Sequence, residues 1–261
     1  MRAIVLAAGY GTRMYPLTRQ QPKALLPIGP RGETVLDYLL AQLGGPELVG
    51  GRRAACPTGN VSVERVLIVT NERFAPLFAA AAGERSWPFA VELLSDGTAS
   101  PEERLGAIGD LALALERTDT DEPALVLGAD NVFEVSLATL LETFAKHQAT
   151  TIAVMREADP ARLRRTGVVE LSDDGRVLRF EEKPAEPRSQ LAVPPLYVFD
   201  VESLRAVPRH LAEGHSGDAP GSFIAWLSGQ RPVYGAVLEG RRWDIGSMES
   251  YEATRRHFGG G

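Results

Sequence analysis

Apolar runs alternate with amphipathic stretches through the first half of the chain. Short apolar runs bounded by Gly, Pro or polar residues predict buried strands at 2–7, 65–70, 89–94, 123–128 and 150–155. Between these runs, apolar residues recur every three or four positions, which predicts helices over 34–43, 72–82, 104–116 and 136–147. Alternating strands and helices are typical of an open, mostly parallel sheet with helices on both faces.

The alternation changes near residue 160. The stretch GVVELSDDGRVLRFEE at 167–182 predicts two strands joined by an Asp-Asp-Gly turn, which is a β-hairpin. The elements expected after it are a strand at 196–200, helices near 201–212 and 220–228, a strand at 232–238 and a final helix from Ser247. We therefore predict an α/β fold, with a Rossmann-like, mostly parallel sheet flanked by helices and a smaller α+β portion that shares the sheet.

Composition and charge restrict the class of partner. The 261 residues are 44% apolar and 24% charged, with a net charge of −6. A nucleic-acid partner is not expected, because such surfaces need basic stripes. No membrane association is expected either, since no apolar run reaches the ~18 residues of a membrane span. The single cysteine, Cys56, leaves no internal disulfide framework and fits a cytoplasmic location.

The basic residues are divided unequally, because only three of the 28 are lysines. A lysine is a compact, flexible point charge, whereas arginine is a bulky planar fork. Lys146 lies on the predicted helix 136–147, whereas Lys23 and Lys183 lie in Pro-Lys-Ala and Glu-Glu-Lys-Pro. We interpret these last two lysines as candidates for a specific role.

The strand at 2–7 runs directly into a glycine-rich loop, in the segment LAAGYGTRMYPLTRQQPKALLP at 6–27. Ligands of open α/β sheets bind beyond the carboxyl ends of strands. Gly9 and Gly11 lack Cβ atoms, so backbone N–H groups can turn toward anionic oxygens, and Arg13 can bind phosphate in a bidentate manner. The segment is not a P-loop, because no Lys directly follows the glycine. It also lacks the third glycine of the dinucleotide fingerprint, which leaves an NAD enzyme as a weaker alternative.

The pattern G-x-G-T-R followed by P-K resembles the signature of nucleotidyltransferases that activate sugar 1-phosphates, such as glucose-1-phosphate thymidylyltransferases and mannose-1-phosphate guanylyltransferases. In LGAIGDLALAL at 105–115, the chain resembles the family's region next to the nucleobase. The resemblance implies that Lys23 returns from the far side of a long loop to reach the phosphates of an NTP. The residues implied to bind the NTP are Leu6, Ala8, Gly9, Gly11, Thr12, Arg13, Lys23 and Gly106.

Further segments extend the resemblance to a metal and an acceptor site. LVLGADNVF at 125–133 and RRWDIGSMES at 241–250 resemble the family's metal-binding segments, which implies Mg²⁺ as cofactor, held by Asp130 and Asp244. FEEKP at 180–184 and RTGVVE at 165–170 resemble the acceptor motifs. They imply that Gly167 and Glu182 contact the sugar and that Lys183 binds its phosphate. Because alternate strand residues face opposite ways, Glu181 and Glu182 are expected on opposite faces.

Two segments depart from the family's pattern. Thr166 stands where tyrosine is more common, and Pro194-Pro195 stands where the family has a small residue and glycine near the sugar. The two prolines remove two N–H donors, which indicates an unusual acceptor such as a modified sugar or a cyclitol phosphate. Tyr197, two residues further on, is expected in the core rather than against the ligand.

The resemblance implies transfer of a nucleoside monophosphate from an NTP to a sugar 1-phosphate, with release of pyrophosphate. The implied catalytic residues are Arg13, Lys23, Asp130 and Lys183. Two alternatives stay open: the same transfer onto phosphocholine, a phosphonate or a cyclitol phosphate, and a non-catalytic regulator that binds nucleotide or sugar phosphate. The nucleobase also stays open, as does the choice between monomer and homodimer.

One domain is expected, with an NTP-binding half at 1–133, a sugar-phosphate-binding half at 134–257 and a disordered tail at 258–261. The segment 44–63 is expected to be a loop without chemistry.

Overall fold

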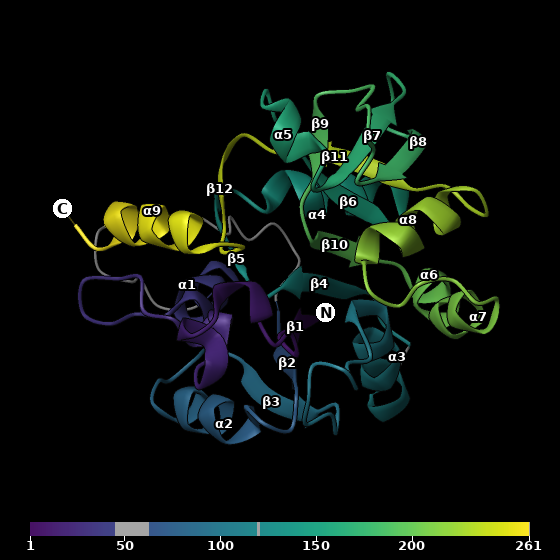
Figure 1. Ribbon diagram of the computed structural model, residues 1–261. Helices are drawn as coiled ribbons and strands as arrows, with labels where there is room; N and C mark the ends of the chain where they lie inside the picture. The colour runs from purple at the N-terminus through teal and green to yellow at the C-terminus, as the bar shows by residue number, and fades with distance from the viewer. Residues whose placement is uncertain (45–62, 119–120, 261) are drawn as a thin grey trace.

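The computed structural model describes residues 1–44, 63–118 and 121–260 (Figure 1). Most of the expected loop at 44–63, with Cys56, lies outside the described residues. In the described part of the chain, no helix has the length and apolar character needed to cross a membrane.

A central sheet of ten strands organises the molecule, and its path is β3-β2-β1-β4-β10-β6-β9-β7-β8, with β11 beside β6. The strands are β1 (Arg2–Leu6), β2 (Arg65–Thr70), β3 (Ala90–Ser95), β4 (Ala124–Gly128), β6 (Thr151–Arg156), β7 (Gly167–Leu171), β8 (Val177–Glu182), β9 (Leu191–Val193), β10 (Leu196–Phe199) and β11 (Tyr234–Val237). Strands β3, β2, β1 and β4 are parallel, whereas β10 is antiparallel to both β4 and β6. The α/β fold and the predicted hairpin β7–β8 are confirmed.

Nine helices and three short 3₁₀ turns are found in the described residues. The helices are α1 (Val35–Gln42), α2 (Ala75–Gly83), α3 (Ala107–Arg117), α4 (Ala138–His147), α5 (Pro160–Leu163), α6 (Val201–Arg205), α7 (Val207–Ala212), α8 (Pro220–Ser228) and α9 (Met248–Phe258). The 3₁₀ turns are η1 (Thr12–Met14), η2 (Leu17–Arg19) and η3 (Lys23–Leu25). Helix α1 begins with a capping box, in which the Thr34 and Asp37 side chains each bond the other's backbone N–H.

Helices cover both faces of the sheet, as the alternating pattern predicts (Figure 1). On one face, α1, α2 and α4 bury residues such as Leu39, Phe78 and Phe144 against the strands. On the other face, α3 and α6–α8 bury residues such as Ile108 and Phe223. Each such side chain contributes about 1.5–3 kcal/mol on leaving water, so the two layers fix the strand ends that carry the site.

A second sheet of two strands was not predicted. It pairs β5 (Asn131–Val135) with β12 (Gly240–Asp244), which are about a hundred residues apart in the sequence. Neither stretch has a clean apolar alternation, because both mix charged and polar residues with the apolar ones. Phe258, which was expected in a disordered tail, is instead the last residue of α9, and its ring centroid lies 4.7 Å from that of Tyr38.

Candidate active site

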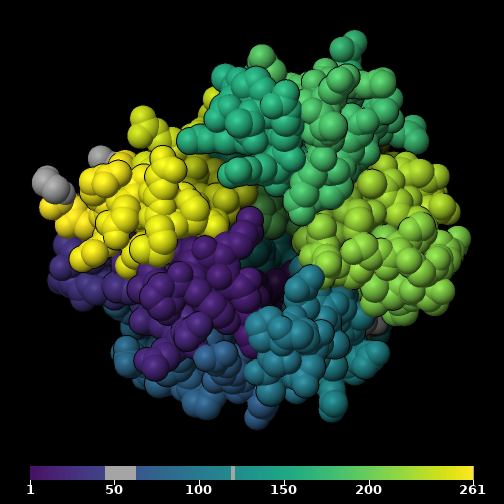
Figure 2. Space-filling model, viewed as in Figure 1, coloured from purple at the N-terminus to yellow at the C-terminus, as the bar shows by residue number. Residues whose placement is uncertain are grey.

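A cleft of about 400 Å³ opens at the carboxyl ends of β1 and β4 (Figure 2). It lies where segments from the N-terminal third, the hairpin and the C-terminal part of the chain meet. The predicted site residues that line it are Leu6, Ala8, Gly9, Gly11, Lys23, Gly106, Asp130, Gly167, Glu182, Lys183 and Asp244. Thr12 and Arg13 do not line it, because η1 leaves both side chains exposed.

Two side-chain hydrogen bonds to backbone carbonyls hold the glycine loop in place. Thr18 donates its hydroxyl to the carbonyl of Gly11 at 2.7 Å, and Asn71 donates its side-chain amide to the carbonyl of Ala8 at 2.9 Å. Gly11 has a φ of +64°, and a Cβ there would lie 3.1 Å from Thr18. The loop therefore presents a fixed backbone to the cleft, which suits the binding of an anion.

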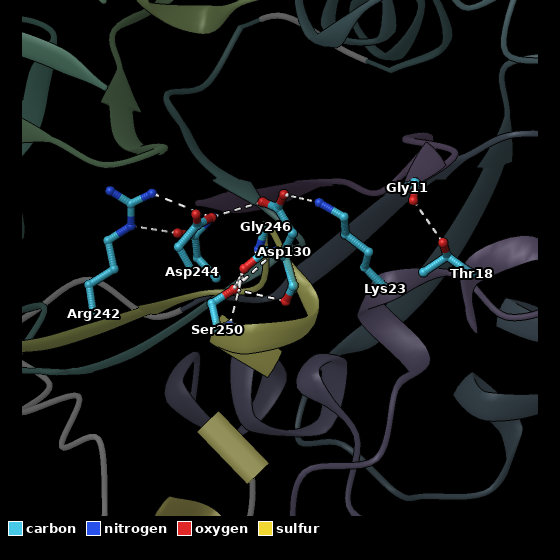
Figure 3. A network of polar contacts seen from close by, with 10 residues as sticks. Gly11, Thr18, Lys23, Asp130, Arg242, Asp244, Gly246 and Ser250 are labelled. Atoms are coloured by element: carbon cyan, nitrogen blue, oxygen red, sulfur yellow. Dashed lines mark hydrogen bonds and ion pairs between the residues drawn. The ribbon is translucent and has the colours of Figure 1, made fainter. Parts of the chain in front are cut away.

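Lys23 reaches the cleft from η3, at the far end of the loop. Its Nζ lies 3.1 Å from Oδ2 of Asp130, and only 12% of its side chain is exposed (Figure 3). The late position of this lysine has a structural reason. Three short turns, η1 to η3, lie between β1 and Leu26, and the last of them places the ammonium group of Lys23 beside Asp130, just after β4.

Asp130 and Asp244 are brought together by the unpredicted small sheet. Asp244 at the end of β12 pairs with Asn131 at the start of β5, and the N–H of Ile245 donates to the carbonyl of Asp130 at 2.8 Å. Partial burial in the cleft and the charge of Asp130 raise the pKa of Asp244. Two neighbouring carboxylates repel each other, and a hard divalent cation bound between them would remove that repulsion.

Asn131 and Arg242 were missed as site residues. The Asn131 side chain is buried; its amide donates to Asp130 at 2.8 Å and its oxygen accepts from Nε of Arg242 at 2.6 Å. Arg242 also lies 3.6 Å from Asp244 and lines the cleft. Asn131 thus orients the two charged neighbours. The Asp-Asn pair at the end of an apolar run was the available signal, whereas nothing local marked Arg242 among 25 arginines.

The other end of the cleft is formed by the hairpin and α8. Glu182 pairs in register with Gly167 and lines the cleft, whereas Glu181 pairs with Arg179 at 2.7 Å and does not. The expectation of opposite faces is therefore confirmed. A Cβ on Gly221 would overlap the Glu182 carboxylate, so any side chain there would have to displace it. Lys183 has a φ of +49°, uncommon for a residue with a side chain, and its Nζ lies 3.3 Å from Glu182.

Of the two prolines, Pro195 forms part of the cleft wall, whereas Pro194 does not line the cleft. The carbonyl of Pro195 accepts from the N–H of Gly128 at 2.9 Å, and a Cβ on Gly128 would lie 2.9 Å from the Pro195 ring. Tyr197 is a core residue as predicted, 3% exposed and 5.7 Å from the Phe199 ring, although it also borders the cleft. Burial raises the pKa of the Tyr197 phenol.

At the nucleobase end that the resemblance implies, Gly106 precedes α3 with a φ of +79°. A Cβ at this position would lie 2.6 Å from the carbonyl oxygen of Gly217. That carbonyl also accepts from the N–H of Ile108 at 2.8 Å, so the start of α3 is fixed against the loop before α8.

A glycine loop, an adjacent lysine and paired carboxylates at one sheet edge are typical of proteins that transfer nucleotides. The chain belongs to the nucleotidyl transferase family, whose model matches residues 2–50 and 53–258. It is 32% identical over 200 residues to a glucose-1-phosphate thymidylyltransferase of Mycolicibacterium smegmatis, covering 77% of this chain and 61% of that relative. The chain thus spans less than two thirds of this relative's length.

A second relative and two solved structures match over more of the chain. A glucose-1-phosphate thymidylyltransferase of Mycobacterium tuberculosis is 27% identical over 261 residues, covering 96% of this chain and 79% of that relative. A crystal structure of UDP-glucose pyrophosphorylase with UDP-glucose has a TM-score of 0.76 at 19% identity, covering 99% and 98% of the two chains. A Bacillus anthracis protein crystallised with sucrose has a TM-score of 0.79 at 19% identity, covering 100% and 96%. These structures confirm the fold.

Proposed function

We propose that this chain transfers a nucleoside monophosphate from an NTP to a sugar 1-phosphate, with release of pyrophosphate. The observation that carries the proposal is the arrangement of charges in one cleft. Lys23, Asp130 and Asp244 lie between the glycine loop at one end and Glu182 with Lys183 at the other. The family match and the thymidylyltransferase relatives support the same reaction.

In the proposed reaction, an acceptor phosphate oxygen attacks the α-phosphorus in line. The new O–P bond forms as the bond to the bridging oxygen of the β-phosphate breaks, and pyrophosphate leaves with that electron pair. A phosphomonoester has a second pKa of about 6, so the acceptor is largely dianionic at neutral pH and needs no general base. Positioning and charge compensation therefore carry the chemistry.

The main barrier is repulsion between two polyanions. Each pair of unit charges 4 Å apart costs about 4 kcal/mol at an effective dielectric constant near 20. Lys23 would neutralise charge on the triphosphate, and Lys183 would neutralise charge on the acceptor phosphate at the opposite end. Arg13 is exposed beside the loop, and its charge already acts on Asp244, so it would join the triphosphate when a nucleotide enters.

The carboxylates of Asp130 and Asp244 fit a magnesium ion. Mg²⁺ takes one or two protein carboxylates together with phosphate oxygens, and the raised pKa of Asp244 marks a place where a cation is favoured. When bound, the ion would neutralise charge on the triphosphate and on the leaving pyrophosphate. Asn131 holds one oxygen of Asp130 at 2.8 Å, leaving the carboxylate in a fixed orientation.

A pyrophosphate-release assay with a panel of NTPs and sugar 1-phosphates tests the proposal. Lys23→Ala and Asp130→Asn are expected to lower turnover about a hundredfold or more. Lys146→Ala is the matched control, because this exposed lysine lies on α4, away from the cleft. Thermal unfolding would verify that all variants are folded. Full activity of both site variants, or no pyrophosphate from any pair of substrates, would contradict the proposal.

A second candidate keeps the transfer but changes the acceptor to a cyclitol phosphate, phosphocholine or a phosphonate. The supporting observation is the Pro195 wall, which has no N–H and whose carbonyl is occupied by Gly128. An acceptor with fewer hydroxyls facing this wall would leave fewer hydroxyls without a hydrogen-bond partner and so would lose less binding free energy. The same assay, extended to these acceptors, decides between the two candidates by their kcat/KM values.

A further inference from the structure

Two carboxyl groups lie at the end of the cleft next to Gly106. Asp110 is in the first turns of α3 and is 5% exposed, and Asp96 follows β3; both line the cleft. Oδ1 of Asp110 and Oδ2 of Asp96 are buried and have no donor among the described residues. The proposed transfer does not use either group, and a buried acceptor without a donor is costly.

The two carboxyl groups lie within hydrogen-bonding reach of each other, so protonation of one would let it donate to the other. Burial, followed by the charge of Asp96, raises the pKa of Asp110 to about 7. Oδ1 of Asp96 accepts from the N–H and hydroxyl of Thr98 at 2.7 and 2.8 Å, which favours the anion on Asp96. Asp110 therefore carries the proton and donates it to Asp96, which leaves the second oxygen of Asp110 as an acceptor.

The pair is tied to the phosphate end of the cleft. The hydroxyl of Thr98 also contacts the hydroxyl of Tyr10 at 2.9 Å, and Tyr10 stands between the two glycines of the loop. Tyr10 is 4% exposed and packs against Phe74, so it does not move freely. The carboxyl pair is thereby held at a fixed distance from the loop that would hold the triphosphate.

The first turn of α3 supplies a donor next to this acceptor. Helix-initial N–H groups have no intrahelical acceptor; those of Ile108 and Asp110 bond Gly217 and Gly106, whereas that of Ala107 has no acceptor among the described residues. Ala107 lines the cleft, and Asp110, three residues on, shares its helix face. The edge therefore offers one N–H donor and one carboxyl acceptor side by side.

We propose that Asp110, oriented by Asp96, is the nucleobase-selecting residue, and that it selects bases with a lactam edge: uracil, thymine or guanine. The base carbonyl accepts from Ala107, and the adjoining ring N–H donates to Asp110. Cytosine and adenine place a ring-nitrogen lone pair opposite the Asp110 oxygen, where two acceptors repel. This assignment rests on the proposed function for the direction in which the NTP lies.

The test compares nucleotides as well as variants. With wild-type protein, kcat/KM is expected to favour UTP, dTTP or GTP over CTP and ATP. The preferred nucleotide should lose about ten- to hundredfold when its ring N–H is methylated, as in 3-methyl-UTP or 1-methyl-GTP. In Asp110→Ala, both preferences should shrink to within a few-fold. Asp110→Asn should retain them, because its amide N–H₂ can bond Asp96 while its oxygen accepts from the base.

Two controls separate selection from a merely structural role. Glu116→Ala removes an exposed carboxylate from the same helix and should leave the nucleotide ratios unchanged. If Asp110→Ala lowers activity with every NTP equally, or if wild-type protein accepts the methylated bases as well as the parent ones, the assignment is wrong. The assay with methylated nucleotides needs only wild-type protein, so it tests the assignment even if a variant fails to fold.

Failure of the proposed function is distinguishable from failure of this assignment. If no NTP yields pyrophosphate, calorimetric titration of wild-type protein with UTP, 3-methyl-UTP, GTP and CTP measures the same preferences as Kd ratios. Equal Kd values, or tighter binding of CTP, would overturn the assignment. Turnover with an unaltered preference in Asp110→Ala would overturn it while leaving the transferase proposal intact.

Discussion

The shared proton of Asp110 predicts a specific pH dependence of folding stability. In the folded protein, burial and the neighbouring Asp96 raise the pKa of this carboxyl to about 7, from 3.8. Between these values the folded state holds a proton that the unfolded chain has released. The stabilisation is therefore complete below pH 3.8 and is lost as the pH rises through about 7. Asp110→Asn replaces the protonated carboxyl by an amide that does not titrate.

The magnitude follows from the two pKa values. At pH 5 the bound proton adds about 3 kcal/mol to the free energy of unfolding. This value is the difference of about 2 between the folded pKa and the pH, multiplied by 1.36 kcal/mol per pKa unit. At pH 8 almost none of this remains. The free energy of unfolding of Asp110→Asn, measured relative to wild type, should thus rise by about 3 kcal/mol between pH 5 and pH 8. Asp96, whose own pKa is raised, and Glu72 are the nearby acids common to both proteins.

Urea unfolding followed by circular dichroism at pH 5, 6, 7 and 8 measures this difference. Groups that do not interact with Asp110, including the buried His210, whose pKa burial lowers, contribute equally to both proteins and cancel. The m-values should agree, because the variant exposes the same surface on unfolding. A difference in unfolding free energy that stays constant across the four pH values would refute the shared-proton account.

Three further substitutions test other contacts. Gly221→Ala should raise the KM of the acceptor at least tenfold with little change for the NTP, because the added methyl displaces Glu182; steady-state kinetics with each substrate varied checks this. Thr18→Val should lower the unfolding free energy by about 1–3 kcal/mol in urea titration, since the Gly11 carbonyl loses its donor; unchanged stability would contradict it. Asp244→Asn should raise the Mg²⁺ concentration for half-maximal activity at least tenfold, and an unaltered Mg²⁺ titration would argue against metal binding there.

The sequence predicted those parts of the site that lie within one contiguous segment. The loop with Gly9 and Gly11, the returning Lys23 and Asp130 at the end of an apolar run all line the cleft. The glycine loop and Asp130 each follow the end of an apolar strand, whereas Lys23 was expected in the site because of the resemblance to the family. The parallel sheet was predictable for the same reason, because buried strands and amphipathic helices have different periods.

What escaped prediction depends on contacts between distant segments. The pairing of β5 with β12, which brings Arg242 to Asp130, has no local periodicity that marks it, and Asp244 was expected beside Asp130 only from the resemblance. The burial of Asp110 was equally hidden, because a carboxyl in the first turn of a helix usually faces water. The exposure of Thr12 and Arg13 follows from η1, a tight turn that the glycine pattern did not reveal.

The position of β10 limits how this enzyme fold can accommodate its ligands. This strand hydrogen-bonds to β4 on one side and to β6 on the other, so the glycine-loop side and the hairpin side of the cleft belong to one continuous sheet. A hinge rotation between the ends would have to break main-chain hydrogen bonds in the middle of the sheet. The spacing between the glycine loop and the hairpin is therefore set by the sheet itself.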